Sequence, residues 1–248
     1  MDNLLIVFKM KTPVVESYKR YPFPLHLDAL LIRLLADEHG TIFNPAIPED
    51  KSPFSPKNLA NIVPLAVVGK KSPVFKASAW LTVEEKVDEE QFIKKYAPPG
   101  IISSNPNKGV RYNPNEASGK NRVWNEKIKI IATPFIFFEC EGDREEITRI
   151  LKKPFRIGKM RRVGFGEVES VVVFSSNNPH AGIYLADGSP ARILPVEEFD
   201  PPNKENSSII SAVPRPPYWN LLDKELCWEP RRLVSPENFN LGFTGSEI

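Results

Sequence analysis

The chain has 248 residues, with 33 Lys or Arg against 31 Asp or Glu, so its formal net charge is +2. A surface that binds a polyanion must therefore come from local clustering of basic residues and not from bulk charge. Apolar residues make up 41% and charged residues 26%, which is typical of a globular chain. Two isolated cysteines and the lack of a run of roughly 20 apolar residues argue against a disulfide framework and a membrane span. We therefore expect a soluble, cytoplasmic protein.

The first third of the chain predicts a strand, a helix and a further strand. Asn3–Met10 is apolar and rich in β-branched residues, which is typical of a strand. A helix that packs on one face is expected next, because five leucines follow the i, i+3, i+4, i+7, i+8 spacing: Leu27, Leu30, Leu31, Leu34 and Leu35. Residues 41–63 are rich in Pro, Asn and Ser and indicate a long loop. Val74–Leu81 alternates and predicts another strand.

Residues 97–122 show no hydrophobic period, and Gly, Pro, Asn and Ser dominate them. A long segment of this kind inside a compact domain is usually functional or mobile. Its charge is mostly basic, with Glu116 opposed by Lys108, Arg111, Lys120 and Arg122.

The next part predicts a strand, a helix and a strand. Residues 123–140 read as one long strand, with Pro134 at a bulge or an edge. Asp143, with a glutamate three residues later, is a capping pattern for a short helix that ends at Pro154. Glu167–Phe174 alternates and predicts the last strand of this set.

The order strand, helix, strand, strand, helix, strand predicts an α+β fold. It is the ferredoxin-like (RRM-like, βαββαβ) arrangement, an antiparallel sheet with two helices on one face. We expect this domain to span residues 1–175, with the 97–122 segment inserted in it. Residues 176–248 carry short strand-like pieces among many prolines, so we expect a mostly β or irregular extension packed on the domain.

A basic, glycine-rich loop precedes the last predicted strand. Seven basic residues without an acid fall within fourteen positions: Arg149, Lys152, Lys153, Arg156, Lys159, Arg161 and Arg162. Backbone N–H groups at Gly158, Gly164 and Gly166, together with guanidinium groups, suit phosphate oxygens. Phe165 between two glycines could stack on a base. The alternative is a turn whose glycines only let the backbone fold sharply into the strand.

Two common nucleotide-binding loops do not fit this segment. A dinucleotide fingerprint needs GxGxxG between a strand and a following helix, whereas here the loop follows a helix and the third glycine is missing. A GxxxxGK[ST] phosphate loop is absent from the sequence. The sequence therefore predicts contact with a polyanion backbone and no bound cofactor.

The combination of "YPFPLHLDALLIRLL" (Tyr21–Leu35) with "RRVGFGEV" (Arg161–Val168) resembles the RAMP superfamily of CRISPR-associated RNA-binding proteins. Within it, the chain is similar to the Cas-five-type subunit of type IV effector complexes. The resemblance covers roughly residues 1–175 and implies a non-catalytic subunit that binds the 5′ handle of the guide RNA and caps the backbone filament. It also implies contact with the backbone and large subunits, and indirect contact with target DNA.

Carried over residue by residue, the resemblance implies roles for individual positions of the loop. Gly158, Gly164 and Gly166 would shape it, and Lys159, Arg161 and Arg162 would meet phosphates. In relatives, a thumb between the second and third strands reaches over the RNA. Here residues 97–122 occupy that place and would contribute Lys108, Arg111, Lys120 and Arg122.

Two alternatives stay open at this point. Some RAMP proteins cut the guide precursor by metal-independent acid–base attack of a ribose 2′-OH, and His26, with Tyr18 or Tyr21, is the candidate set. The three histidines and two cysteines show no metal-ligand spacing, so no metal is expected. The second alternative is a protein-only adaptor whose basic loop binds an acidic partner.

Overall fold

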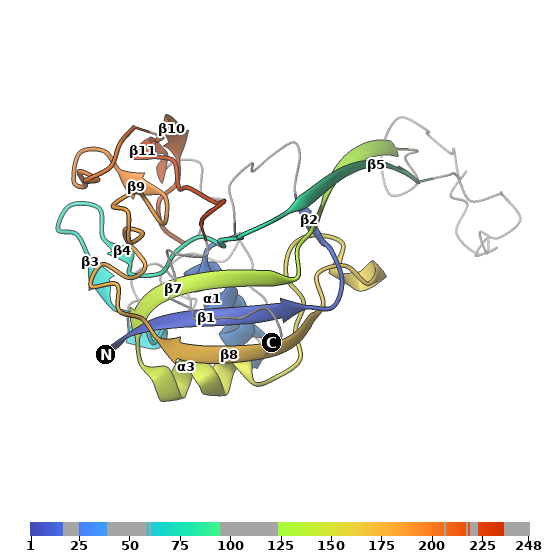
Figure 1. Ribbon diagram of the computed structural model, residues 1–248, viewed down its shortest axis with the longest axis horizontal. Coiled ribbons are helices and arrows are strands. Elements are labelled where there is room, and N and C mark those ends of the chain that lie inside the picture. The colour runs from blue at the N-terminus through green and yellow to red at the C-terminus, as the bar shows by residue number, and fades with distance from the viewer. Residues whose placement is uncertain are drawn as a thin grey trace, which may run out of the picture.

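The computed structural model describes residues 1–16, 25–38, 59, 61–94, 124–205, 207–216, 218 and 223–235. Its centre is an antiparallel sheet in the order β7-β1-β8 (Figure 1). Strand β1 (Asp2–Met10) lies between β7 (Phe135–Gly142) and β8 (Val168–Ser175). β1 thus pairs with two segments that follow more than 120 positions later in the chain. The first strand is therefore the centre of the domain.

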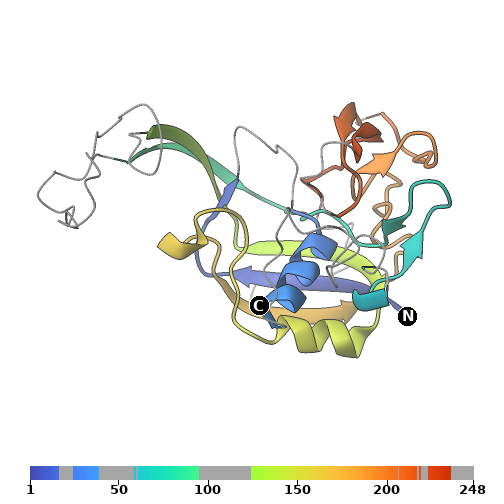
Figure 2. The ribbon, with the colours of Figure 1, turned by 180° about the vertical axis from the view of Figure 1, so that it is seen from behind.

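Two helices cover one face of this sheet, as Figure 2 shows from behind. Helix α1 (Leu27–Glu38) begins just after the buried His26, and α3 (Arg144–Leu151) begins after Asp143, whose carboxylate accepts the Glu146 N–H at 3.1 Å. The helical stripes pack on alternate residues of β1, Leu4, Ile6 and Phe8, in one apolar cluster. The sequence features that predicted these elements were the β-branched apolar run of β1, the leucine spacing of α1 and the capping pattern of α3.

The opposite face of the sheet is also buried. Leu5 and Val7 of β1 and Phe137 of β7 pack there with Leu185 and Val234 from the C-terminal part of the chain. That part contains a small sheet in the order β10-β11-β9, formed by β9 (Leu194–Pro195), β10 (Ile209–Ala212) and β11 (Glu225–Trp228). The C-terminal region therefore forms a second layer on the sheet.

The strand predicted at Val74–Leu81 is mostly irregular. Regular pairing is limited to β3 (Val67–Val68) with β4 (Val74–Phe75), and residues 77 and 81 then form isolated antiparallel bridges to β7. The reason is that successive N–H groups bond to different neighbours. Ser78 and Leu81 donate to β7, while Ala79 donates to Ala191 and Trp80 to Leu25.

The single strand predicted at 123–140 is two strands in two different sheets. β6 (Trp124–Ala132) pairs with β5 (Lys86–Lys94) and with β2 (Val14–Glu16), whereas β7 joins the central sheet. The break lies at Pro134, which has no N–H to donate and whose carbonyl accepts the Met10 N–H. β5 and β6 form an arm that extends from the body (Figure 1), and the predicted thumb, residues 97–122, lies outside the described residues.

A buried ion pair ties the C-terminal region to α1. The Arg192 guanidinium and the Asp28 carboxylate are both fully buried and lie 3.4 Å apart. Arg192 also donates to the carbonyls of Phe75 and Pro214, and the Tyr218 hydroxyl donates to Asp28 at 2.7 Å. Burial raises the pKa of Asp28, although Arg192 and Tyr218 act in the opposite direction. Four chain segments thus meet at one guanidinium.

No helix in the part of the chain that the structure describes is long and apolar enough to cross a membrane. Cys140 and Cys227 are both buried free thiols.

Replacing Arg192 by Met should lower the free energy of unfolding by about 3–5 kcal/mol, because it leaves the Asp28 carboxylate buried without its cation. Urea denaturation at neutral pH measures the loss. The control is Lys9→Gln, which breaks an exposed pair with Glu169 (3.3 Å; side chains 39% and 49% exposed) and should cost less than about 1 kcal/mol. Equal losses in the two variants would contradict a structural role for the buried pair.

Candidate nucleic-acid interface

The glycine-rich loop runs from the end of α3 to β8 and is fixed by backbone hydrogen bonds. Lys159 N–H donates to the Val15 carbonyl at 2.8 Å, and Gly166 N–H donates to the Pro13 carbonyl at 2.7 Å. Within the loop, Ile157 N–H donates to the Gly166 carbonyl at 2.8 Å. The loop is therefore held in one conformation against the segment that leads into β2.

A short 3-10 turn, η2 (Arg161–Val163), forms the tip of the loop and bears two adjacent arginines. It lies between two residues with left-handed backbone, Met160 (φ 54°) and Gly164 (φ 103°). Reversing the chain within three residues this way exposes the side chains of Arg161, Arg162 and Val163. The turn thus presents two guanidinium groups to solvent.

Two of the three glycines are required by close packing. A Cβ at Gly166 would lie 1.9 Å from the Ile157 carbonyl oxygen, and one at Gly158 would lie 2.5 Å from Val14 Cγ1. A Cβ at Gly164 would meet nothing within 4 Å, so its positive φ alone favours glycine there. These positions fit the alternative in which the glycines let the backbone fold sharply, since Gly158 and Gly166 serve packing and Gly164 serves the turn, and phosphate contact by the loop stays a prediction.

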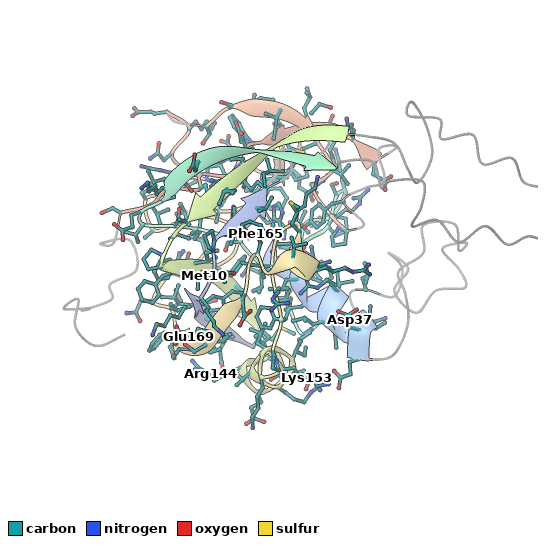
Figure 3. The ribbon with its side chains drawn as sticks, turned by 90° about the vertical axis from the view of Figure 1, so that its right-hand side faces the viewer. Met10, Asp37, Arg144, Lys153, Phe165 and Glu169 are labelled. Atoms are coloured by element: carbon teal, nitrogen blue, oxygen red, sulfur yellow. The ribbon has the colours of Figure 1, made fainter. Side chains whose placement is uncertain are left out.

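Phe165 packs on the fold. Its partly buried ring lies with Met160 against an apolar cluster of Val15, Ile128 and Ile130, from β2 and β6. This packing accounts for an aromatic residue between two glycines without a stacked base. The ring joins the loop to the root of the arm (Figure 3).

Three of the seven clustered basic residues are paired within the protein. Arg149 bonds to Glu38 and Glu146, and Lys153 lies 3.4 Å from Glu38. Arg156 bonds to Glu167 at 2.7 Å. Hydrogen bonds from Lys11 and Arg156 lower the pKa of Glu167 to about 2, so this carboxylate stays charged across the neutral range. The local sequence run contains no acid, but Glu38 of α1 and Glu167, just before β8, supply acids in space.

The other four form no ion pair within 4.0 Å among the described residues: Lys152, Lys159, Arg161 and Arg162. Partial burial, and then the neighbouring charge of Arg162, lower the pKa of Arg161. Two like charges held side by side without a counter-ion favour an anion between them.

These arginines border a groove of about 490 Å³ between α1 and the loop. Arg161 and Arg162 line it on the loop side, and Arg33 lines it from α1 with a buried Nε that has no described hydrogen-bond partner. The groove also has an apolar wall formed by Leu34, Ile150 and Phe155. Figure 3 views this side of the molecule, with Asp37 on α1 and Lys153 near the end of α3. Arg33 was not among the residues that the sequence predicted, because a charged residue of a helix outside its apolar stripe is usually exposed to solvent.

His26, the candidate for acid–base chemistry, is 2% exposed. Its ring stacks on Tyr218 with centroids 4.9 Å apart, and its Nε2 accepts the Ile193 N–H at 3.3 Å. These contacts account for the histidine as part of the buried network around Arg192. Its proposed companions, Tyr18 and Tyr21, lie outside the described residues.

The remaining sequence-predicted contacts, Lys108, Arg111, Lys120 and Arg122, also lie outside the described residues. Among the residues that are described, no group of three or more His, Cys, Asp or Glu side chains could hold a metal ion.

Replacing Gly166 by Ala should lower the free energy of unfolding by about 2–5 kcal/mol, because the new Cβ meets a backbone oxygen at a positive φ. Gly164→Ala is the matched control, since Gly164 also has a positive φ (103°, against 68° at Gly166) but lies in open space, and the change should cost about 1 kcal/mol. Chemical denaturation of both variants gives the comparison. If Gly164→Ala costs as much as Gly166→Ala, the close approach to Ile157 does not hold the loop.

Comparison with known proteins gives one family. The model of the family described as CRISPR type IV associated protein Csf3 matches residues 2–230. No curated protein matches the chain. The matched range includes the central sheet, both helices, the basic loop and most of the C-terminal layer.

Proposed function

Because the chain belongs to the Csf3 family of type IV CRISPR-associated proteins, we propose that it is a non-catalytic subunit of the effector that binds the guide RNA through the basic groove. The groove is the observation that carries the proposal. Arg33, Arg161 and Arg162 line one cavity and form no ion pair among the described residues, and the cations that line the cavity outnumber its two acids, Asp37 and Glu38. RNA backbone supplies the closely spaced negative charges that such a group of guanidinium groups binds.

The shape of the groove fits single-stranded RNA better than a lone phosphate. Its cavity of about 490 Å³ has guanidinium groups on the loop side and an apolar wall of Leu34, Ile150 and Phe155. A nucleotide combines a charged phosphate with a base whose flat faces are apolar. The phosphate would contact the guanidinium groups and the base would contact the apolar wall. The groove would bind backbone charge with little dependence on base identity.

The strand arrangement supports our assignment of a ferredoxin-like, RAMP-type domain. The first strand is central, the last strand lies on one side of it and β7 on the other, all antiparallel. The segment bridged to the far side of β7, residues 77–81, takes the position of the second strand in that fold. The family match and this order together support a Cas-five-type subunit that binds the 5′ handle and caps the filament.

The arm supports the proposed thumb. β5 and β6 pair over nine residues and connect to the central domain between the second and third strand positions. The root of the arm is held by Arg232, which bonds to Glu16 and Glu85 and lies over the Trp80 ring at 5.1 Å. A hairpin anchored in this way would carry residues 97–122 to an RNA or to a neighbouring subunit.

Mutating Arg161 and Arg162 together to Gln should weaken guide-RNA binding and reduce the salt dependence of binding, with a slope lower by roughly 1.4, about 0.7 for each lost phosphate contact on a single strand. Fluorescence anisotropy at several salt concentrations measures both quantities. Lys153→Gln with Arg156→Gln is the matched control, because it removes the same formal charge from residues lining the same groove that already have carboxylate partners. Equal effects of the two pairs would show that bulk charge, and not the groove, drives binding.

We expect purified protein to leave labelled repeat RNA intact in EDTA. His26→Ala should lower the melting temperature, because it empties a stacked and hydrogen-bonded position, and should leave the RNA products unchanged. Gel analysis of the RNA and thermal denaturation measure the two results. Specific cleavage by the wild type that disappears in the His26 variant would replace our proposal with the ribonuclease alternative.

A further inference from the structure

A second cavity lies on the face of the central sheet opposite the helices. It has a volume of about 390 Å³ and is formed by β7 and by the turns that follow β8, with Glu139, Asn178, His180, Tyr184 and Asp187 among its lining residues. Glu139 faces this side because it pairs with Leu5 of β1, whose side chain packs in the same layer. The cavity is therefore separated from the basic groove by the thickness of the sheet and helices.

Glu139 is a buried carboxyl group that pairs with no cation in the part of the chain that the structure describes. The residue is 3% exposed, and its two oxygens accept from neutral groups, Ser176 Oγ at 3.1 Å and Asn178 Nδ2 at 2.8 Å. No Lys or Arg among the described residues lies within 4.0 Å of it. Burial raises its pKa to about 7 despite both hydrogen bonds. A carboxylate accepts about four hydrogen bonds, so acceptor capacity remains on a group that is costly to bury unpaired.

The rim of the cavity is aromatic and acidic. The rings of His180 and Tyr184 stand edge to face with centroids 6.0 Å apart, and burial together with the Asp200 carboxylate raises the pKa of Tyr184. Asp187 is held at the rim by Arg231 at 2.8 Å. Because Asp187 is already paired, Glu139 is the carboxylate that disfavours a phosphate here, and a carboxylate floor below aromatic rings favours a guanidinium group.

We propose that this cavity is the docking site for an arginine side chain of a neighbouring protein subunit, with Glu139 as the counter-ion of the inserted guanidinium. A planar guanidinium bonds to a carboxylate through two parallel N–H groups and stacks on aromatic rings, so it satisfies the floor and the rim together. The type IV family of the chain supplies the context of partner subunits. The proposal does not depend on RNA binding at the groove.

The direct test is an NMR titration of the full chain with Nα-acetylarginine amide. Saturable shifts of the Asn178 side-chain amide and the Tyr184 ring are expected, and Nα-acetylcitrulline amide, the neutral isostere, should cause none. Glu139→Gln should abolish arginine binding and should still fold, because it replaces a carboxyl group that burial already disfavours in its charged form. Absence of saturable arginine binding to the wild type overturns the proposal, and so does equal binding of arginine and citrulline.

The pH dependence of the same titration needs no variant. Only the ionised Glu139 pairs with guanidinium, so the arginine affinity should rise about tenfold from pH 6 to pH 8, as expected for a free carboxyl with a pKa of about 7. The elements packed against Glu139 contribute Leu5 and Ser78, which do not titrate, and the cavity contributes His180, Tyr184 and Asp187. The His180→Asn variant should show the same rise in arginine affinity with pH. An arginine affinity that does not change with pH in the wild type and in this variant overturns the role of Glu139.

Two further outcomes decide the occupant. Guanosine also presents adjacent N–H donors to a carboxylate, so guanosine binding in place of arginine would assign the cavity to RNA and overturn a protein partner. In the assembled effector, the exposed His180 should be protected from diethyl pyrocarbonate. If His180 reacts in the complex as fast as in the free chain, no subunit covers the cavity and the proposal is wrong.

Discussion

The buried guanidinium of Arg192 is the interaction on which the arrangement of the chain depends most directly. It reaches the first turn of α1 through Asp28, the segment beside β7 through the Phe75 and Ala77 carbonyls, and the C-terminal region through Pro214 and Tyr218. Burying an ion pair of this kind gains little over an apolar replacement, but removing one partner is costly. The pair therefore specifies which segments meet, and it places the C-terminal layer on the sheet. His26 belongs to the same network through its stacking on Tyr218.

Ion pairs formed in the folded protein reduce the number of unpaired cations in and near the basic loop. As a sequence, the loop and the end of its helix hold seven cations and no acid, but Glu38 and Glu167 neutralise three of them. The remaining excess is concentrated on η2, where Arg161 and Arg162 face the groove with Arg33. Local structure thus converts a diffuse basic run into a small site. An RNA strand bound as we propose would therefore contact the arginines of η2 and not the cations that Glu38 and Glu167 already pair.

The parts of the fold that the sequence predicted are those that bury apolar side chains in the core. Leucines at helical spacing predicted α1, an apolar and β-branched run predicted β1, and alternation predicted β8. β5 was not predicted, since Lys86–Lys94 is rich in charges and Val87 is 46% exposed. One long strand was predicted over residues 123–140, with Pro134 at a bulge or an edge, because a proline does not by itself show that the two halves join different sheets. Arg33 and the partners of Arg192 could not be found this way, since their contacts join residues as far apart as 164 positions.

The short strand β2 fixes the distance between the basic loop and the root of the arm. Val15 pairs with Ile130 of the arm and its carbonyl accepts the N–H of Lys159 in the basic loop, so one residue is bonded to both. Phe165 adds an apolar contact between the same two parts. Loop and arm root are therefore one rigid unit, with a separation set by backbone hydrogen bonds. If both contact the same RNA strand, the geometry of the protein, and not the sequence of the guide, sets the number of nucleotides that the protein covers.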